Sequence, residues 1–367
     1  MKRQNFYEDE MLNRIDEKYI VEQILNLKES LGDELIILTH HYQRNEIVDI
    51  GHFRGDSFEL SKKAAADKNA RFIIFCGVHF MAESAEILSQ SHQTVQIPDK
   101  GAGCPMADMA DIVNVENAWK DVTSIIGKET ITPIVYMNSD ANLKAFCGRN
   151  GGIVCTSSNA QEAFYWGFDQ REKIFFFPDQ HLGRNTGIQM GLQPEEMIVW
   201  NPKKRLGGNT QESIEEAKVF LWDGYCHVHT RFRVEHVLKM KEEYPDATIV
   251  VHPECSKEVV ELADAVGSTS FIVKYVENAP SGATIIIGTE INLINRLSIE
   301  NPDKTVFELY YSLCPNMFKI SSRNLLWTLE NIGKDNVVSV SGDIKADARI
   351  ALDRMLNLVP SVDIRNR

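Results

Sequence analysis

The feature that most constrains this chain is a strand–helix–strand pattern that occurs three times along its length. Each copy opens with a largely β-branched apolar run of strand length, which ends in a polar or aromatic cluster. A hydroxyl side chain then precedes a helical pattern, and a second apolar run follows. The opening runs are LIILTHHY (35–42), ITPIVYMNS (131–139) and TIVVHPE (248–254), and the later runs are RFIIFCGV (71–78), KIFFFPDQH (173–181) and TIIIGTE (284–290).

Alternating strands and helices predict parallel sheets flanked by helices, and internal repetition predicts copies of one structural unit. We therefore expect an α/β protein with three similar three-layer αβα domains. If these domains surround a pseudo-threefold axis, their polar strand ends converge on one cavity. The expected segments are an N-terminal helical segment (1–33), αβα domains carrying Cys104 (34–125), Cys226 (126–240) and Cys314 (241–320), and a C-terminal helical segment (321–367).

Two segments depart from the repeat. Residues 8–31 predict a charged amphipathic helix with Ile20, Ile24 and Leu27 on one face. The middle repeat is longer than the others, and we expect its extra residues within 186–216. That region contains the Gly- and Asn-rich stretch KKRLGGNTQES (203–213), which is typical of a surface loop.

Charge and hydropathy exclude some classes of function. The net charge of -13 argues against nucleic-acid binding, which needs a basic surface, but it leaves room for an anionic small substrate at a locally positive site. No run approaches the roughly 20 apolar residues of a membrane span. The start, MKRQNFYEDEML, has no apolar signal core, so we expect a cytoplasmic protein without a membrane partner.

Three of the seven cysteines occupy equivalent places, at the end of each repeat. Any single free cysteine is ordinarily a buried small hydrophobe, and an odd number in a reducing compartment argues against a disulfide framework. Three thiolates suit zinc or an iron–sulfur cluster. A four-iron cluster held by three cysteines leaves one iron open to act as a Lewis acid. The equivalent cysteines are Cys104, Cys226 and Cys314; Cys76, Cys147, Cys155 and Cys255 are expected to be structural.

Hydroxyl side chains precede the helix of each repeat. Ser57, Ser157 and Thr269 are each expected to cap a helix. A cap position is also an anion site, because free backbone N–H groups and the helix dipole favour carboxylate or phosphate there. Three such positions would suit substrates with several negative charges.

Titratable side chains cluster at the ends of the opening strands. His40, His41 and Tyr42 follow the first strand directly, and His252 and Glu254 follow the third domain's strand. Either group is a plausible set for acid–base chemistry, although a lone histidine near a strand end is usually structural.

Other polar residues at these strand ends have less specific signals. Pro253 would stiffen the turn between His252 and Glu254. Tyr136 and Asn138 are able to orient a substrate carbonyl by hydrogen bonds. His181 and Arg184 either supply positive charge or belong to a solvated loop.

A dense series of short motifs resembles the quinolinate synthase family, of its longer type. The motifs occur in that family's order and cover residues 35–330 nearly throughout, so the resemblance does not rest on one motif. They are THHYQ (39–43), GDSFELSKKA (55–64), FCGVHFMAE (75–83), GAGCPMADMAD (101–111), YMNSDANLKAFCG (136–148), CTSSNA (155–160), FFPDQHLGRNT (176–186), GYCHVH (224–229), HPEC (252–255), GST (267–269), IGTE (287–290) and CPNM (314–317).

The resemblance implies three αβα domains around a pseudo-threefold axis, with the active site where they meet. It implies one [4Fe–4S] cluster, held by Cys104, Cys226 and Cys314 and acting as a Lewis acid on substrate oxygen. The implied enzyme is a transferase-type synthase with dehydratase steps. It condenses iminoaspartate with dihydroxyacetone phosphate to quinolinate, phosphate and two waters in de novo NAD biosynthesis. L-Aspartate oxidase supplies the imine.

The resemblance also implies roles for individual residues. Proton transfer is implied for Tyr42, His40, His252 and Glu254. Substrate binding is implied for His40, Ser57, Tyr136, Met137, Asn138, Ser157, His252, Pro253, Glu254 and Thr269.

One departure from the family concerns the third cysteine. Some relatives carry extra cysteines at positions that here are Glu308, Tyr311 and Asn316, so no local thiol–disulfide switch is available beside Cys314. Two other readings stay open. A zinc-dependent hydrolase lacks a paired motif such as H-E-x-x-H, and a non-catalytic iron–sulfur redox sensor leaves the polar strand ends without a role.

Overall fold

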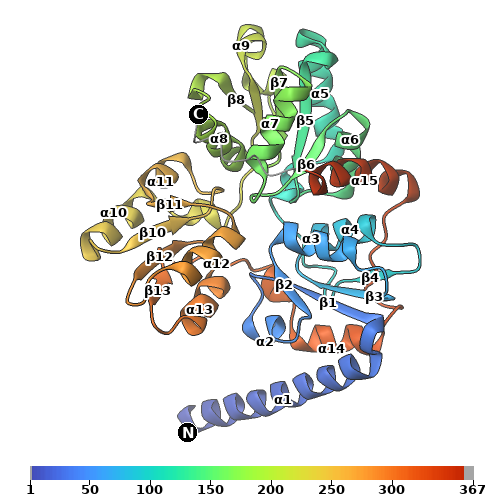
Figure 1. The fold of residues 1–367 in the computed structure, drawn as a ribbon, viewed down its shortest axis with the longest axis vertical. Coiled ribbons are helices and arrows are strands. Elements are labelled where there is room, and N and C mark those ends of the chain that lie inside the picture. The colour runs from blue at the N-terminus through green and yellow to red at the C-terminus, as the bar shows by residue number, and fades with distance from the viewer. Residues whose placement is uncertain (1, 359–367) are drawn as a thin grey trace. The chain divides into compact units, whose positions relative to one another are not determined.

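The computed structural model describes residues 2–358, with side chains described from residue 16. The predicted α/β class is confirmed, because the strands form three parallel sheets flanked by helices (Figure 1). The chain divides into two compact units. Unit 1 comprises residues up to Gly103 together with Pro315–Ser339, and unit 2 comprises Cys104–Cys314 together with residues from Val340 on.

Unit 1 contains the first sheet, in the order β2-β1-β3-β4. Helices α3 and α4 lie on one face and α14 on the other (Figure 1). The strands are β1 (Leu35–His40), β2 (Phe53–Gly55), β3 (Phe72–Cys76) and β4 (Thr94–Gln96), and the helices are α1 (Lys2–Leu31), η1 (Gly32–Glu34), α2 (Asn45–Val48), α3 (Ser57–Ala66), α4 (His79–Leu88), η7 (Met317–Lys319) and α14 (Ser322–Glu330).

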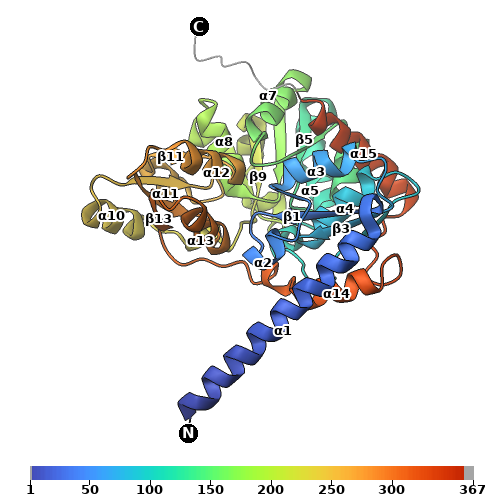
Figure 2. The same ribbon diagram turned by 60° about the horizontal axis from the view of Figure 1, so that its bottom comes forward.

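The predicted N-terminal helix is present as α1, which lies beside α14 in both views (Figure 2). Ile20 and Ile24 are buried on one face, as expected, and Leu27 is partly buried. Arg323 of α14 pairs with Asp16 of α1 at 3.0 Å. The apolar stripe therefore docks the helix onto unit 1.

Unit 2 contains the second and third sheets, in the orders β6-β5-β7-β9-β8 and β11-β10-β12-β13. All their strand pairs are parallel. The strands are β5 (Ile131–Tyr136), β6 (Ile153–Cys155), β7 (Lys173–Phe177), β8 (Met197–Trp200), β9 (Val219–Trp222), β10 (Thr248–Val251), β11 (Ala265–Val266), β12 (Thr284–Gly288) and β13 (Thr305–Glu308).

The helices of unit 2 alternate with these strands, and the last of them, α15, packs on α6 and β6. They are η2 (Ala107–Met109), α5 (Ile112–Ile126), η3 (Lys128–Thr130), α6 (Ala141–Arg149), α7 (Ala160–Gln170), α8 (Gln180–Gln189), η4 (Pro194–Glu196), η5 (Arg205–Gly208), α9 (Gln211–Glu216), η6 (His229–Arg231), α10 (Val234–Glu243), α11 (Lys257–Leu262), α12 (Thr269–Asn278), α13 (Ile291–Glu300) and α15 (Gly342–Leu356).

The three sheets share the order of four strands. In each, the first strand pairs with the second and third, and the third also pairs with β4 in the first sheet, with β9 in the middle sheet and with β13 in the last sheet. This shared order supports the threefold repetition found in the sequence. The exact domain boundaries and the pseudo-threefold axis stay predictions. Residue 1 of the expected N-terminal segment and residues 359–367 of the C-terminal one lie outside the described residues.

The extra residues of the middle repeat add a fifth strand. The loop expected at 203–213 is wrong in part, because this stretch includes η5 and the start of α9. The preceding strand β8 pairs with β9 and buries Trp200. Gly207 has φ 66°, and a Cβ there would lie 2.4 Å from the Trp200 indole. Burial of that indole therefore orders a stretch whose composition is typical of a loop.

Across residues 2–358, no helix combines the length and apolarity that crossing a membrane requires.

Candidate active site

Each of the three cysteines closes a turn that is anchored in the same way. The helix after the third strand of each sheet donates its first backbone N–H to the carbonyl two residues before the cysteine. The donor–acceptor pairs are His79–Ala102 at 2.8 Å, Gln180–Gly224 at 2.9 Å and Ile291–Ser312 at 2.9 Å. The equivalence inferred from sequence spacing therefore has a counterpart in local hydrogen bonding.

The backbone conformation after each cysteine is also repeated. A single 3-10 turn begins three residues later, as η2, η6 and η7. Backbone N–H groups of Met106 and Ala107 bond Cys104, and that of His229 bonds Cys226. Such N–H donors stabilise a thiolate and are the usual partners of cysteine sulfurs that bind iron–sulfur clusters.

The three cysteines differ in burial from the other four. Cys104, Cys226 and Cys314 are partly exposed, whereas the remaining cysteines are fully buried. Burial first, and then Cys314 and Glu254, raise the pKa of Cys104 to about 12. Burial also raises the pKa of Cys226, with added contributions from Glu254 and Cys104. Cys104 therefore lies within electrostatic reach of both other cysteines, and a bound cation would relieve this crowding of acidic groups.

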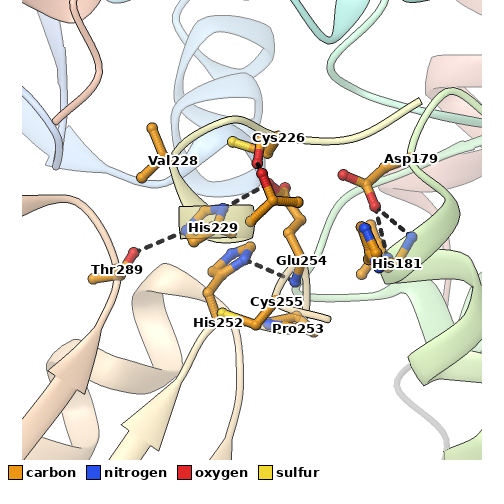
Figure 3. Close-up of polar contacts among 12 residues, drawn as sticks. Asp179, His181, Cys226, Val228, His229, His252, Pro253, Glu254, Cys255 and Thr289 are labelled. Atoms are coloured by element: carbon orange, nitrogen blue, oxygen red, sulfur yellow. Dashed lines mark hydrogen bonds and ion pairs between the residues drawn. The ribbon is translucent and has the colours of Figure 1, made fainter. Parts of the chain in front are cut away.

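Glu254 joins the ends of two sheets. Its Oε1 accepts the Tyr136 hydroxyl at 2.5 Å, and its Oε2 lies 2.8 Å from His229 Nδ1 (Figure 3). Burial alone would raise the pKa of Glu254, but His229 and His252 reverse this and hold it at about 2. The site therefore contains a buried, ionised carboxylate with a phenol and an imidazole as partners.

His229 is a residue that the sequence reasoning missed. Its Nε2 lies 3.1 Å from Thr289 Oγ1, and its ring stacks on His252 at 4.2 Å between centroids (Figure 3). One ligand atom from each of Cys226, His229 and Glu254 lies within 4.8 Å of the others. The C-x-x-H spacing of Cys226 and His229 was the available signal.

Asp179 was missed as well. It is the N-cap of α8, and its Oδ1 accepts the N–H groups of His181 and Leu182, each at 2.8 Å (Figure 3). Its Oδ2 is buried and has no hydrogen-bond partner among the described residues. Burial first, and then Glu254, raises its pKa well above the ordinary range. Its position just after β7, comparable to that of Tyr136 at the end of β5, could have identified it.

The predicted residues of unit 1 lie at the end of β1 and the start of α3. His40 is the last residue of β1, and its Nδ1 accepts the Tyr42 N–H at 3.1 Å. The two rings meet edge to face at 4.8 Å. His41 Nε2 lies 3.9 Å from a Glu59 carboxylate oxygen. Their acid–base roles stay predictions.

The expectation that the three hydroxyl residues cap helices is wrong. Ser57 and Thr269 are the first helical residues of α3 and α12, and Ser157 lies before the cap of α7. Neighbouring residues take the N-cap positions because their φ and ψ angles leave the helix there. These N-caps are Asp56, Asn159 and Ser268.

A cavity of about 590 Å³ lies among α7, α8 and α12 in unit 2. Ser157 and Pro253, both predicted to bind substrate, line it. Gly267 and Ser268, directly before Thr269, line it too. The N-termini of α7 and α12 therefore border one cavity, which is a favourable setting for an anion.

The residues after β5 are largely enclosed. Met137 is buried, and Asn138 Oδ1 is buried without a partner among the described residues. The same holds for Asn159 Nδ2. The Oδ1 of Asn159 accepts the Thr156 N–H at 2.7 Å. One acceptor and one donor thus remain unsatisfied near the ends of the adjacent strands β5 and β6.

His181 and Arg184 do not lie in a solvated loop, because both belong to α8. Burial is the main cause that lowers the pKa of each. Glu258 acts in the opposite direction on both. They stay candidates for positive charge rather than members of the Glu254 cluster.

Comparison with known proteins places the chain in a family. The family model described as quinolinate synthetase A protein matches residues 22–357. A quinolinate synthase of Corynebacterium glutamicum is 48% identical over 97% of this chain and 91% of its own length. One of Rhodopirellula baltica is 45% identical over 93% and 91%, and one of Bacillus cereus is 44% identical over 95% and 96%. The chain belongs to the quinolinate synthetase A family.

Proposed function

We propose that this chain condenses iminoaspartate with dihydroxyacetone phosphate to quinolinate, releasing phosphate and two waters in de novo NAD biosynthesis. The observation that carries the proposal is the set of three equivalently anchored cysteines in a member of this family, two of which are influenced by the charge of Glu254. The imine would come from L-aspartate oxidase, in the cytoplasm. The enzyme would be a transferase-type synthase with dehydratase steps.

The proposed reaction balances without an oxidant or reductant. Carbon, nitrogen, hydrogen, oxygen and phosphorus of the two substrates all appear in quinolinate, phosphate and two waters. The chain's task is therefore to hold anions, move protons and assist the departure of hydroxyl groups.

The residues present fit one [4Fe–4S] cluster on Cys104, Cys226 and Cys314. These thiols are partly exposed and influence one another, and backbone N–H groups already bond two of them. When bound, the cluster would supply a Lewis acid at the iron that no cysteine holds.

Tyr136, Glu254 and His229 form a hydrogen-bonded series suited to proton movement. Glu254 is ionised and accepts from the Tyr136 hydroxyl at 2.5 Å, while His229 lies 2.8 Å from its other oxygen. The Tyr136 hydroxyl would take a proton from substrate as it passes its own proton to Glu254 along this hydrogen bond. His252, stacked on His229, would orient substrate. Proton transfer is proposed for Tyr42 and His40 as well.

Anion binding would fall to the helix starts. Ser157, Pro253 and Thr269 border or adjoin the cavity among α7, α8 and α12, and Ser57 opens α3. Met137 and Asn138 follow Tyr136, and Asn138 Oδ1 has an unsatisfied acceptor among the described residues. Carboxylates and phosphate would bind at these positions.

An anaerobic assay tests the proposal. Wild type, Tyr42→Phe and Cys226→Ala are supplied with freshly generated iminoaspartate and dihydroxyacetone phosphate, and quinolinate is measured. Wild type should form quinolinate, Tyr42→Phe should be about 10²-fold slower, and Cys226→Ala should be inactive. A wild type that retains its cluster and makes no quinolinate overturns the assignment.

A zinc enzyme is the second candidate, because Cys226, His229 and Glu254 form a mixed set that Zn²⁺ accepts. In this structure His229 and Glu254 bond each other instead. Metal analysis after anaerobic purification separates the two readings: iron with sulfide supports the cluster, and zinc alone supports the hydrolase.

A further inference from the structure

Asn185 connects α8 to the loop that carries Glu254. Its side chain is 2% exposed, and its Nδ2 donates to the carbonyl of Pro253 at 2.8 Å and to that of Cys255 at 2.9 Å. Both partners are acceptors, so the amide must present its NH₂ group to them. The orientation of the amide is thereby determined.

The two carbonyls lie on either side of Glu254 in the chain. The same loop is held from within by the Glu254 N–H, which donates to His252 Nδ1 at 3.3 Å, and by the Cys255 N–H, which donates to the His252 carbonyl at 3.0 Å. Asn185 adds two hydrogen bonds from outside the loop. It comes from the second sheet's helix, and the loop follows the third sheet's first strand.

These bonds to the loop matter because the Glu254 carboxylate makes two short hydrogen bonds to residues on different segments. Tyr136 is the last residue of β5 and His229 follows Cys226, and one carboxylate must reach both. A displacement of the loop by about 1 Å would break at least one of these bonds, and errors of that size cost about 10²-fold in rate.

We propose that Asn185 is a positioning residue that fixes the Glu254 backbone, so that its carboxylate bonds Tyr136 and His229 together. This inference rests on the proposed function, since it assigns Asn185 to the same site. Asn185 acts through Glu254 and does not itself contact the substrate.

A double-mutant cycle on the intact enzyme tests the proposal. Asn185→Leu keeps the size of the side chain but removes both N–H donors. In wild type it should lower kcat about 10- to 100-fold with little change in KM for dihydroxyacetone phosphate. In a Glu254→Gln background it should lower the residual kcat less than about threefold, because the carboxylate to be positioned is already gone.

The matched control is Asn301→Leu. Asn301 is another buried asparagine whose Nδ2 donates to a backbone carbonyl, that of Leu297 at 2.9 Å, but it ends α13. It should lower kcat less than about threefold in either background. Equal losses from Asn185→Leu in both backgrounds would show a general structural role and overturn the proposal.

A measurement that needs no activity separates this proposal from the proposed function. Amide hydrogen exchange at Glu254 and Cys255 should be at least tenfold faster in Asn185→Leu than in wild type, and unchanged in Asn301→Leu. A wild type without quinolinate formation would remove the proposed function alone. Unchanged exchange at these two amides would remove the positioning role, whatever the activity.

Discussion

Among single residues, Glu254 is a buried carboxylate between two histidines. A carboxylate with no access to solvent would ordinarily take up a proton, yet here the pKa is held at about 2 after burial is offset by His229 and His252. Its neighbour Asp179 shows the opposite shift, because burial and Glu254 raise its pKa. Two buried acids with opposed shifts are typical of catalytic centres.

The hydroxyl of Tyr136 can be tested directly. Tyr136→Phe removes the donor to Glu254 and keeps the ring, so we expect kcat to fall about 10²-fold and the free energy of unfolding to change by about 1 kcal/mol. Tyr244→Phe is the control, since Tyr244 is exposed and packs on Phe307. Quinolinate formation and urea unfolding measure the two effects. An unchanged kcat in Tyr136→Phe would contradict the proton-transfer role of this series.

His52 should make stability depend on pH. Its Nδ1 accepts the Ile37 N–H at 2.8 Å, and burial first, then Lys28, lowers its pKa from 6.5. The unfolded chain therefore takes up a proton more readily than the folded one. The free energy of unfolding should fall as pH drops below about 6.5. His52→Gln removes this titration, so its loss of stability between pH 7 and pH 5.5 should be smaller than that of wild type in urea unfolding. Equal losses would show that His52 contributes nothing.

Among the elements, the turn before each cysteine has the same hydrogen bond in all three repeats but a different residue at the accepting position. The residue two positions before the cysteine is Ala102, Gly224 or Ser312, and each accepts a helix N–H. In the middle repeat, the Pro178 carbonyl lies against this residue, Gly224. A Cβ on Gly224 would lie 2.3 Å from the Pro178 carbonyl oxygen, so glycine is required there.

Gly224→Ala should displace the Cys226 turn. The clash is with backbone, which cannot move aside cheaply, so we expect a loss of about 1–3 kcal/mol in the free energy of unfolding and a lower iron content. Gly103→Ala is the matched control beside Cys104, because a Cβ there meets no described atom within 4 Å. Iron and sulfide analysis of both variants decides the matter. Full iron content in Gly224→Ala would show that the turn is not held by this contact.

In the whole molecule, the three cysteines should act together and the other four should not. Anaerobically purified wild type should be brown, absorb at about 400 nm and carry one four-iron cluster per chain. Cys104→Ala should lose the cluster, whereas Cys76→Ala, which alters a buried residue of β3, should keep it. Air should bleach the wild type, because the three thiols proposed to hold the cluster are partly exposed. A colourless protein with zinc would contradict the assignment.

Much of the fold could be predicted because strands buried in parallel sheets appear in the sequence as short continuous apolar runs. β1 and β5 consist entirely of buried residues, and β10 is buried after its first residue. Their β-branched composition predicts such strands. The edge strand β8 could not be predicted in this way. Its order depends on Trp200 packing against Gly207, which is a contact that no local pattern contains.

The candidate site also has a part that the sequence predicts and a part that it does not. By itself the sequence determined the three equivalent cysteines, the polar strand ends with Glu254 and His252, and the family, because each depends on residue type at a repeated position. Only the tertiary structure decided that His229, Asp179 and Asn185 converge on Glu254, and that Asp56, Asn159 and Ser268 cap the helices. The physical reason is that burial, hydrogen-bond geometry and pKa shifts arise between segments distant in sequence, and those distances exist only after folding.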